Sequence, residues 1–350
     1  MPTPINISAS RGASILGLSK WSTPLNVWLQ IMESREPGFC EKNKYELPEF
    51  EYNAPMRWGH AFESAIIELA EGEQGEVIIE REKLYGYGNP LNTFITCHID
   101  GLYSTQKLHE GKTTTIFSYR DEWGEPGTDK VPVEYQIQCQ HQMICTGAEK
   151  VILSVLVFPR RVDDWEEMGI TSDYEKFNYE KLIPKNKLVK LNDDKSRWHN
   201  SIDPYNWAII LDEMGYFHQY EIPANPELQK LMIEHYTEFW EVNVVGGMMP
   251  EPRTYDDIKA ICREPVGTII ATEEIERFMS EYKNIKSEIS TTGALAKRAD
   301  QIKVTVLDFM RTNGADAVDD DSADKFILRD RTGAKIGSYG KNKNGGLIFR

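Results

Sequence analysis

The sequence predicts an α/β fold, because helix-type and strand-type hydrophobic patterns alternate along its first half. Apolar residues recur at helical spacing over 55–71 and 132–146. The segments 93–102 and 107–117 are expected to form a hairpin of two strands, and 151–158 is an apolar, β-branched run apart from Ser154, typical of a strand buried on both faces. Helix, hairpin, helix and buried strand together indicate a sheet with helices packed against it.

Further elements are expected on either side of this core. A turn-rich entry followed by a helix fits 8–34, where Pro24 suits a first helical position. From residue 225 onward helices dominate, and 325–350 returns to short strands and glycine turns. The helices predicted for this part of the chain are 226–244, 255–262 and a long stretch from 272 to about 312.

These patterns also predict the domain organisation. The segment 160–216 is irregular and rich in aromatic residues and lysines, and we interpret it as an insertion. We therefore expect two domains. Residues 1–222 would carry the α/β core with its insertion, and residues 223–350 would form a largely helical extension that ends in a short basic β segment.

Composition excludes several classes of protein. No apolar run is long enough to cross a bilayer, and the start of the chain lacks the pattern of a secretory signal, so a soluble intracellular protein is expected. The five cysteines are scattered without a CxxC pair, which suggests neither a disulfide framework nor a structural zinc site. A net charge of -15 argues against coating nucleic acid through bulk electrostatics, but it allows an enzyme with a locally basic channel.

The chemistry is concentrated in the predicted hairpin. Asp100 lies near the end of its first strand, while Glu110 and Lys112 are two residues apart on the second strand and so share a face. Between them Gly111 leaves its carbonyl open to approach. Two carboxylates and a carbonyl are hard oxygen ligands for Mg²⁺ or Mn²⁺, and an ammonium beside them can hold an attacking water or stabilise a pentacovalent phosphate. The pattern therefore predicts phosphodiester hydrolysis.

Two neighbouring helices favour this interpretation over a simpler one. An isolated Glu-x-Lys on a strand is commonly an exposed charge pair, and Glu63 by itself would be interpreted as a solvated helix acid. However, Glu63 follows Gly59 by one helical turn, which leaves a bare patch for another group to approach. The helix 132–146 also carries several glutamines in an apolar context, and these need hydrogen-bond partners if they are buried.

The motifs, taken in order, resemble those of the YqaJ-type viral recombinase family, whose members are lambda-exonuclease-like nucleases of the PD-(D/E)xK superfamily. The resemblance covers roughly 8–158, resumes weakly near 220–231, and implies a restriction-endonuclease-like core with a central mixed sheet flanked by helices. The motifs that carry it are Gly59-x-x-x-Glu63, His98-Ile99-Asp100-Gly101, Glu110-Gly111-Lys112-Thr113 and Tyr135-x-x-Gln138-x-Gln140-His141-Gln142-Met143. An opening motif that includes Ser10, Trp21 and Trp28 agrees with it.

The resemblance assigns the metal and catalytic residues. It makes Asp100 and Glu110 metal ligands and Lys112 the catalytic lysine. Glu63 becomes the helix carboxylate near the metals, and it reaches one of them directly or through water. Two Mg²⁺ ions are implied, for which Mn²⁺ can substitute. No iron–sulfur cluster of the kind found in some related nucleases is expected, because the cysteines do not flank the core in the required number.

The resemblance also assigns residues that contact the substrate or support the site. Gln138 corresponds to a helix glutamine that supports the active site, with Tyr135 beside it. Ser10 matches a serine that binds the 5′-phosphate of the substrate in relatives. Arg11 stands where many relatives have an acid, and His98 replaces a second phosphate-binding serine; it would donate a hydrogen bond or equally be a strand histidine satisfied within the fold.

The implied activity is that of an exonuclease that degrades linear double-stranded DNA from 5′ to 3′. It would leave 3′ single strands for phage-type recombination by strand annealing. The implied partners are double-stranded DNA ends, a single-strand annealing protein and two further copies of the chain in a ring-shaped homotrimer, with no membrane. A phage or prophage protein that acts in the cytoplasm of a bacterial host is expected.

Two alternatives stay open at this point. The same metal site would serve a structure-specific or restriction-like endonuclease, and a nuclease scaffold can also act as a non-catalytic DNA-binding protein. A separate question concerns the basic end of the chain, which either contacts phosphates or is a solvated β-hairpin. Its basic residues are Arg329, Arg331, Lys335, Lys341 and Lys343.

Overall fold

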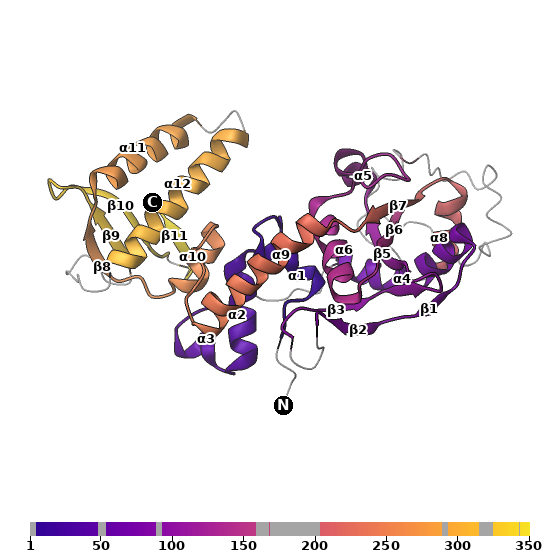
Figure 1. Cartoon of the computed structure of the whole chain (residues 1–350). Coiled ribbons are helices and arrows are strands. Elements are labelled where there is room, and N and C mark those ends of the chain that lie inside the picture. Colours follow the sequence, from indigo (N-terminus) through magenta and orange to yellow (C-terminus); the bar gives the residue numbers. More distant parts are fainter. Residues whose placement is uncertain are drawn as a thin grey trace. The chain divides into compact units, whose positions relative to one another are not determined.

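The computed structural model describes residues 5–47, 54–88, 93–158, 168, 204–288, 293–314, 325–342 and 344–350. Contacts divide the chain into two compact units, each assembled from separate stretches of sequence (Figure 1). The core unit comprises Asn6–Leu18 and Phe50–Thr237, and the C-terminal unit comprises Met1–Ile5, Ser19–Glu49 and Glu238–Arg350. The domain boundary expected after residue 222 stays a prediction.

The core unit is built on a five-stranded mixed sheet with the order β1-β4-β5-β6-β7. Its central strands β5 and β6 are parallel, and the other neighbours are antiparallel. The predicted central mixed sheet is therefore confirmed, including the strand β6, which is buried from Val151 to Val157. The strands are β1 (Ile78–Glu80), β4 (Gly101–Tyr103), β5 (Leu108–Thr114), β6 (Lys150–Val157) and β7 (Phe217–Pro223).

Helices cover both faces of this sheet. On one face α4 (Ala54–Gln74) packs on β5 and β6, and α8 (Pro204–Glu213) packs on α4 and β6. The opposite face of β5 contacts α6 (Val133–Thr146), on which α1 (Ala9–Ile15) packs in turn (Figure 1). The expected α/β architecture with a sheet flanked by helices is confirmed.

The predicted first strand, 93–102, is interrupted at Asp100. Before it, β3 (Thr96–Ile99) leaves the main sheet and pairs with β2 (Lys83–Gly86); after it, β4 joins β1 and β5. The hydrophobic alternation continues through the bend, so the pattern alone did not reveal the change of partner. The break places Asp100 at the point where β5 loses its antiparallel neighbour.

Two further expectations about local structure were wrong. The second strand was predicted to continue to 117, but β5 ends at Thr114 and α5 (Ile116–Glu122) begins after Thr115, whose hydroxyl accepts a hydrogen bond from the amide of Ser118. The turn-rich entry contains the helix α1. By contrast, α2 (Pro24–Arg35) begins at the expected proline.

The end of the predicted insertion belongs to the core. Trp207, Ala208 and Leu211 of α8 are buried in the same hydrophobic cluster as Phe62 and Ile66 of α4. The parts of the insertion at 160–167 and 169–203 lie outside the described residues. Helix α8 is therefore a packed element of the core unit rather than part of an insertion. The sequence did not reveal this, because the residue pattern on either side of it is irregular.

The C-terminal unit is less purely helical than expected, because it contains a four-stranded sheet with the order β11-β10-β9-β8. Strand β8 was not predicted, and the long stretch from 272 forms two helices that lie side by side, α11 and α12 (Figure 1). The helix expected over 226–244 is α9 (Pro226–Glu238), which belongs to the core unit as far as Thr237, followed by a π-helical turn, η3 (Phe239–Val245), in the C-terminal unit. The remaining elements are α3 (Phe39–Lys42), α10 (Tyr255–Ile261), β8 (Gly267–Ile270), α11 (Glu273–Glu288), α12 (Gly293–Asn313), β9 (Lys325–Arg329), β10 (Lys335–Lys341) and β11 (Leu347–Phe349).

Segments far apart in sequence are joined within this unit. The hydroxyl of Thr23, which caps α2, donates to a carboxylate oxygen of Asp257 at 2.7 Å. The indole N–H of Trp28 donates to the carbonyl of Asn243 at 2.8 Å. Asp257 is itself fully buried and accepts from the amides of Arg253 and Thr254, so this junction is a satisfied polar network rather than a surface contact.

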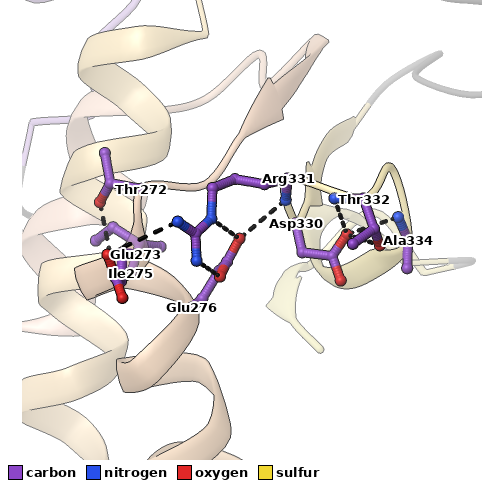
Figure 2. A network of polar contacts seen from close by, with 8 residues as sticks. All are labelled: Thr272, Glu273, Ile275, Glu276, Asp330, Arg331, Thr332 and Ala334. Carbon is purple, nitrogen blue, oxygen red and sulfur yellow. Dashed lines mark hydrogen bonds and ion pairs between the residues drawn. The ribbon is translucent and has the colours of Figure 1, made fainter.

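One arginine of the basic chain end is engaged within the protein. Figure 2 shows Arg331, in the turn between β9 and β10, with its guanidinium on Glu276 of α11; the nitrogen–oxygen distances are 3.1 and 3.2 Å. Glu273 lies 3.7 Å from a further guanidinium nitrogen. Arg331 therefore links the turn to α11 through ion pairs at the surface, and the question of whether the basic end contacts phosphates stays open. Lys343 lies outside the described residues. No helix in the described ranges is long and apolar enough to cross a membrane.

The close approach of α1 to α9 gives a test of the core packing. A Cβ added at Gly12 would overlap the hydroxyl oxygen of Tyr236, which is buried and has no hydrogen-bond partner among the described residues. We expect Gly12→Ala to lower the free energy of unfolding by about 1–3 kcal/mol. In a Tyr236→Phe background the same substitution should be less destabilising, because the overlapping oxygen is gone. Urea unfolding of the four proteins measures this, and an equal loss in both backgrounds would contradict the packing.

Candidate active site

The site lies between the central strand β5 and helix α6. Strand periodicity places Glu110 and Lys112 on one face of β5, and helical periodicity places Tyr135, Gln138 and Gln142 on one face of α6. The two faces meet through side-chain contacts. The Lys112 ammonium lies 5.3 Å from the centre of the Tyr135 ring, and both glutamines donate to Glu110.

Glu110 is a buried carboxylate with three donors. Its side chain is 1% exposed. The ammonium of Lys112 and the amide of Gln138 both donate to Oε1, and the amide of Gln142 donates to Oε2 at 2.5 Å. A buried charge without such partners would be strongly destabilising. The amide nitrogens of Gln138 and Gln142 therefore have the kind of partner that buried glutamines were predicted to need.

Asp100 lies at the edge of β5, beside Glu110. The last antiparallel pair of β4 and β5 is Gly101 with His109, so Asp100 and Glu110 would form the next one. The Asp100 carboxylate accepts the amide N–H of Gly111 at 2.9 Å. Because the N–H and C=O of one strand residue point to the same side, the Gly111 carbonyl also faces this edge. The structure thus brings together both acids and the carbonyl that the sequence singled out.

The charges of this group perturb one another. Burial, and then the negative charge of Glu110, raise the pKa of Asp100 to about 7, against the opposing effect of Lys112. Burial by itself lowers the pKa of Lys112, but attraction by Glu110 and Asp100 outweighs it, so the net direction is upward and the amine stays protonated. Perturbed carboxylates of this kind are concentrated at functional sites.

Glu63 approaches the same group from the other layer. It lies on α4, is partly exposed, and its charge contributes to the raised pKa of Asp100. One turn earlier Gly59 faces strand β5, since a Cβ there would lie 4.0 Å from the Thr113 hydroxyl. Among the described residues, however, no three His, Cys, Asp or Glu side chains lie close enough together to hold a metal. Glu63 is therefore a neighbour of the two acids without forming a three-carboxylate cluster with them.

The donors present fit a hard divalent cation. Carboxylate and carbonyl oxygens are the preferred ligands of Mg²⁺ and Mn²⁺. The mutual repulsion that raises the pKa of Asp100 is also what a cation between the two acids would relieve. The five cysteines are free and buried, and the expected absence of an iron–sulfur cluster stays a prediction.

Of the four residues expected to bind the substrate, Tyr135 lies against Lys112, whereas no described contact joins the other three to the acids of the site. Ser8 and Ser10 hydroxyls are 3.1 Å apart at the start of α1, and the guanidinium of Arg11 donates to the Ser8 hydroxyl. Burial lowers the pKa of Arg11. His98 is exposed on β3, opposite Leu84 of β2. No described contact joins Ser10, Arg11 or His98 to the acids of the site, and their roles stay predictions.

One residue of the site was not assigned a role from the sequence. Gln142 holds Glu110 as closely as Gln138 does, and its position four residues later on the same helix face was the available signal. Gln140, on another face, is structural: its side chain donates to the Pro223 carbonyl and accepts from the Asn225 amide.

Fold and site together define an α/β protein with two acids and a lysine gathered at the central strand of a mixed sheet. Residues 4–149 match the model of the YqaJ-like viral recombinase domain, which confirms the resemblance drawn from the motifs. A Bacillus subtilis (strain 168) protein, the uncharacterized protein YqaJ, is 22% identical over 304 residues, covering 81% of this chain and 73% of that protein.

Similar solved structures include an alkaline exonuclease (LHK-Exo) from Laribacter hongkongensis. It has a TM-score of 0.42 and 17% identity, and the alignment covers 69% of this chain and 89% of that chain. Another is a phage related exonuclease from Haemophilus somnus 129PT, with a TM-score of 0.38 and 16% identity, covering 70% of this chain and 98% of that chain.

The raised pKa of Asp100 predicts how its replacement changes stability with pH. The Asp100 carboxyl binds its proton more tightly in the folded protein than in the unfolded chain, where its pKa is about 3.9. The Asp100 side chain therefore makes the free energy of unfolding fall as the pH rises from about 4 to about 7. We expect Asp100→Asn to change stability little at pH 4 but to raise it at pH 8 by at most about 4 kcal/mol. Urea unfolding in EDTA measures this; a gain independent of pH would contradict the shift.

Proposed function

We propose that this chain is a metal-dependent deoxyribonuclease that degrades linear double-stranded DNA from 5′ to 3′. The observation that carries the proposal is the gathering of Asp100, Glu110 and Lys112 at one edge of β5, in a segment that matches the YqaJ-like viral recombinase domain. The 3′ single strands that remain would serve strand annealing in phage-type recombination, together with a single-strand annealing protein.

The acids and the carbonyl of this edge would hold the metal. Asp100, Glu110 and Gly111 would supply the oxygen ligands, and Glu63 would reach one of the ions directly or through water. A divalent cation, Mg²⁺ or Mn²⁺, would supply Lewis-acid polarisation of the phosphate and lower the pKa of a bound water. The buried, hydrogen-bonded state of Glu110 supports this assignment, because it fixes the carboxylate before any cation binds.

Lys112 would act on the phosphate. Its side chain is partly exposed, and its ammonium lies against the Tyr135 ring and is paired with Glu110, so the charge is oriented in a side chain that a substrate could approach. A positive charge at that position stabilises the extra negative charge of a pentacovalent phosphate or positions the attacking water. Gln138 keeps Oε1 of Glu110 in place beside it.

Substrate binding and assembly form the finer part of the proposal. Ser10, Arg11 and His98 would contact the DNA end, and the paired hydroxyls beside the Arg11 guanidinium are chemically suited to a phosphate. A ring-shaped homotrimer would let a chain of net charge -15 enclose DNA, with its basic residues facing the hole. A monomeric mass in the presence of DNA would count against the ring.

The lysine gives the first test of catalysis. We expect Lys112→Met to lower the rate of DNA degradation by about 100-fold or more, because charge stabilisation at the reacting phosphate is lost. Lys150→Ala is the matched control, since Lys150 lies exposed on β6 in an ion pair with Glu221. Lys150→Ala should keep the unfolding temperature of the wild type, whereas Lys112→Met should lower it because the buried Glu110 loses its cationic partner, so the rates are compared well below both unfolding temperatures. Wild-type activity in the Lys112 variant would remove the assigned role.

The substrate gives the second test. Purified protein with Mg²⁺ is incubated with linear duplexes labelled at either end, with and without a 5′-phosphate, and with covalently closed circular DNA. We expect loss of the 5′-terminal label first and an intact circle, because an exonuclease needs an end. Cleavage of the circle would favour the endonuclease, and binding without cleavage would favour a non-catalytic DNA-binding protein.

A further inference from the structure

We propose that Gln142 is a positioning residue of the nuclease site, which directs the one free lone pair of Glu110 toward the metal. The proposal rests on the proposed function. It starts from a count of acceptor positions: a carboxylate offers about four lone-pair sites, two on each oxygen. On Oε1 both are used, by Lys112 and Gln138, while among the described residues Oε2 accepts only from Gln142.

This count determines how Glu110 would bind a cation. With Lys112 and Gln138 in place, a metal reaches Glu110 through Oε2 alone, so binding is through one oxygen. That oxygen is the one held by Gln142. Since the amide occupies one lone-pair direction, it also fixes the direction of the other. Gln138, on the other oxygen, fixes the pairing with Lys112, and the two glutamines therefore have separate tasks.

The burial of Gln142 supports a positioning role over simple packing. Its side chain is 1% exposed, and its Oε1 has no hydrogen-bond partner among the described residues. A buried, unsatisfied carbonyl is unfavourable, and an apolar side chain of similar length would fill the same space without it. The hydrogen bond from Nε2 to Glu110 is the polar contact described for this side chain, so the amide is explained by what it does to Glu110.

Gln140 supplies a matched comparison two residues away. It is equally buried, at 2%, but both ends of its amide are satisfied, by Pro223, Asn225 and Gln229. None of these partners belongs to the site. A role in holding α6 in the fold therefore predicts that Gln140 matters for stability, whereas a positioning role predicts that Gln142 matters for the metal.

The test compares Gln142→Met with Gln140→Met in the full-length protein. Mn²⁺ binding to protein freed of metal with EDTA is measured by calorimetry, without DNA. We expect Gln142→Met to weaken Mn²⁺ binding by about 10- to 100-fold, the usual effect of losing a partner that orients a metal ligand. Gln140→Met should lower the unfolding temperature and leave Mn²⁺ affinity unchanged. In degradation assays high Mn²⁺ should restore the rate of the Gln142 variant, with an unchanged KM for DNA.

Each outcome decides between the two proposals. Wild-type Mn²⁺ affinity in a folded Gln142→Met protein would overturn the role of Gln142 and leave the nuclease proposal standing. If wild-type protein itself neither binds Mn²⁺ nor degrades DNA, the proposed function fails first. If Gln142→Met does not fold, Gln142→Leu, which also lacks the amide, is measured in its place. Weak Mn²⁺ binding in the Gln142 variant, together with wild-type Mn²⁺ affinity in Gln140→Met, supports the positioning role.

Discussion

The centre of the core unit depends on satisfying one buried negative charge. Glu110 lies on the central strand of the sheet and is 1% exposed, so its charge is tolerable only if donors are built around it. This requirement explains why α6 carries amides on the face that meets β5, and why Lys112 follows two residues later on the same face. The register between strand and helix is consequently specified by polar contacts as well as by apolar packing.

Much of the core could be predicted from the sequence because its signals were local and strong. The helix at α6 has an apolar period and a glycine at its end in the left-handed region, with a φ of 74°, and β6 is apolar from Val151 to Val157 except for Ser154. The errors concern which strands pair and which elements pack against one another. Nothing in the alternation around Asp100 shows that the strand changes sheets there, and α8 and β8 became recognisable only through the partners that they pack against.

The residues of the candidate site also fall into those that the sequence could predict and those that it could not. The grouping of Asp100, Glu110 and Lys112 followed from spacing on a hairpin, and residues on one face of a strand or helix had to converge. Gln142 was visible in the same pattern, but only geometry shows that its amide, rather than that of Gln140, reaches Glu110. For Ser10, Arg11 and His98 no comparable pattern exists, since their roles depend on where a bound strand of DNA would run.

The way in which each unit is assembled from separate stretches bears on its biosynthesis. The helix that begins after Thr23 is completed by partners more than two hundred positions later, at Asp257 and Asn243, so it leaves the ribosome long before those partners exist. Bringing such distant parts together is slow, because a long loop must close before any contact rewards it. The early segment must therefore wait, with the apolar faces of Leu25 and Trp28 exposed, while the core unit forms. A nascent chain of this design needs shielding from aggregation during translation.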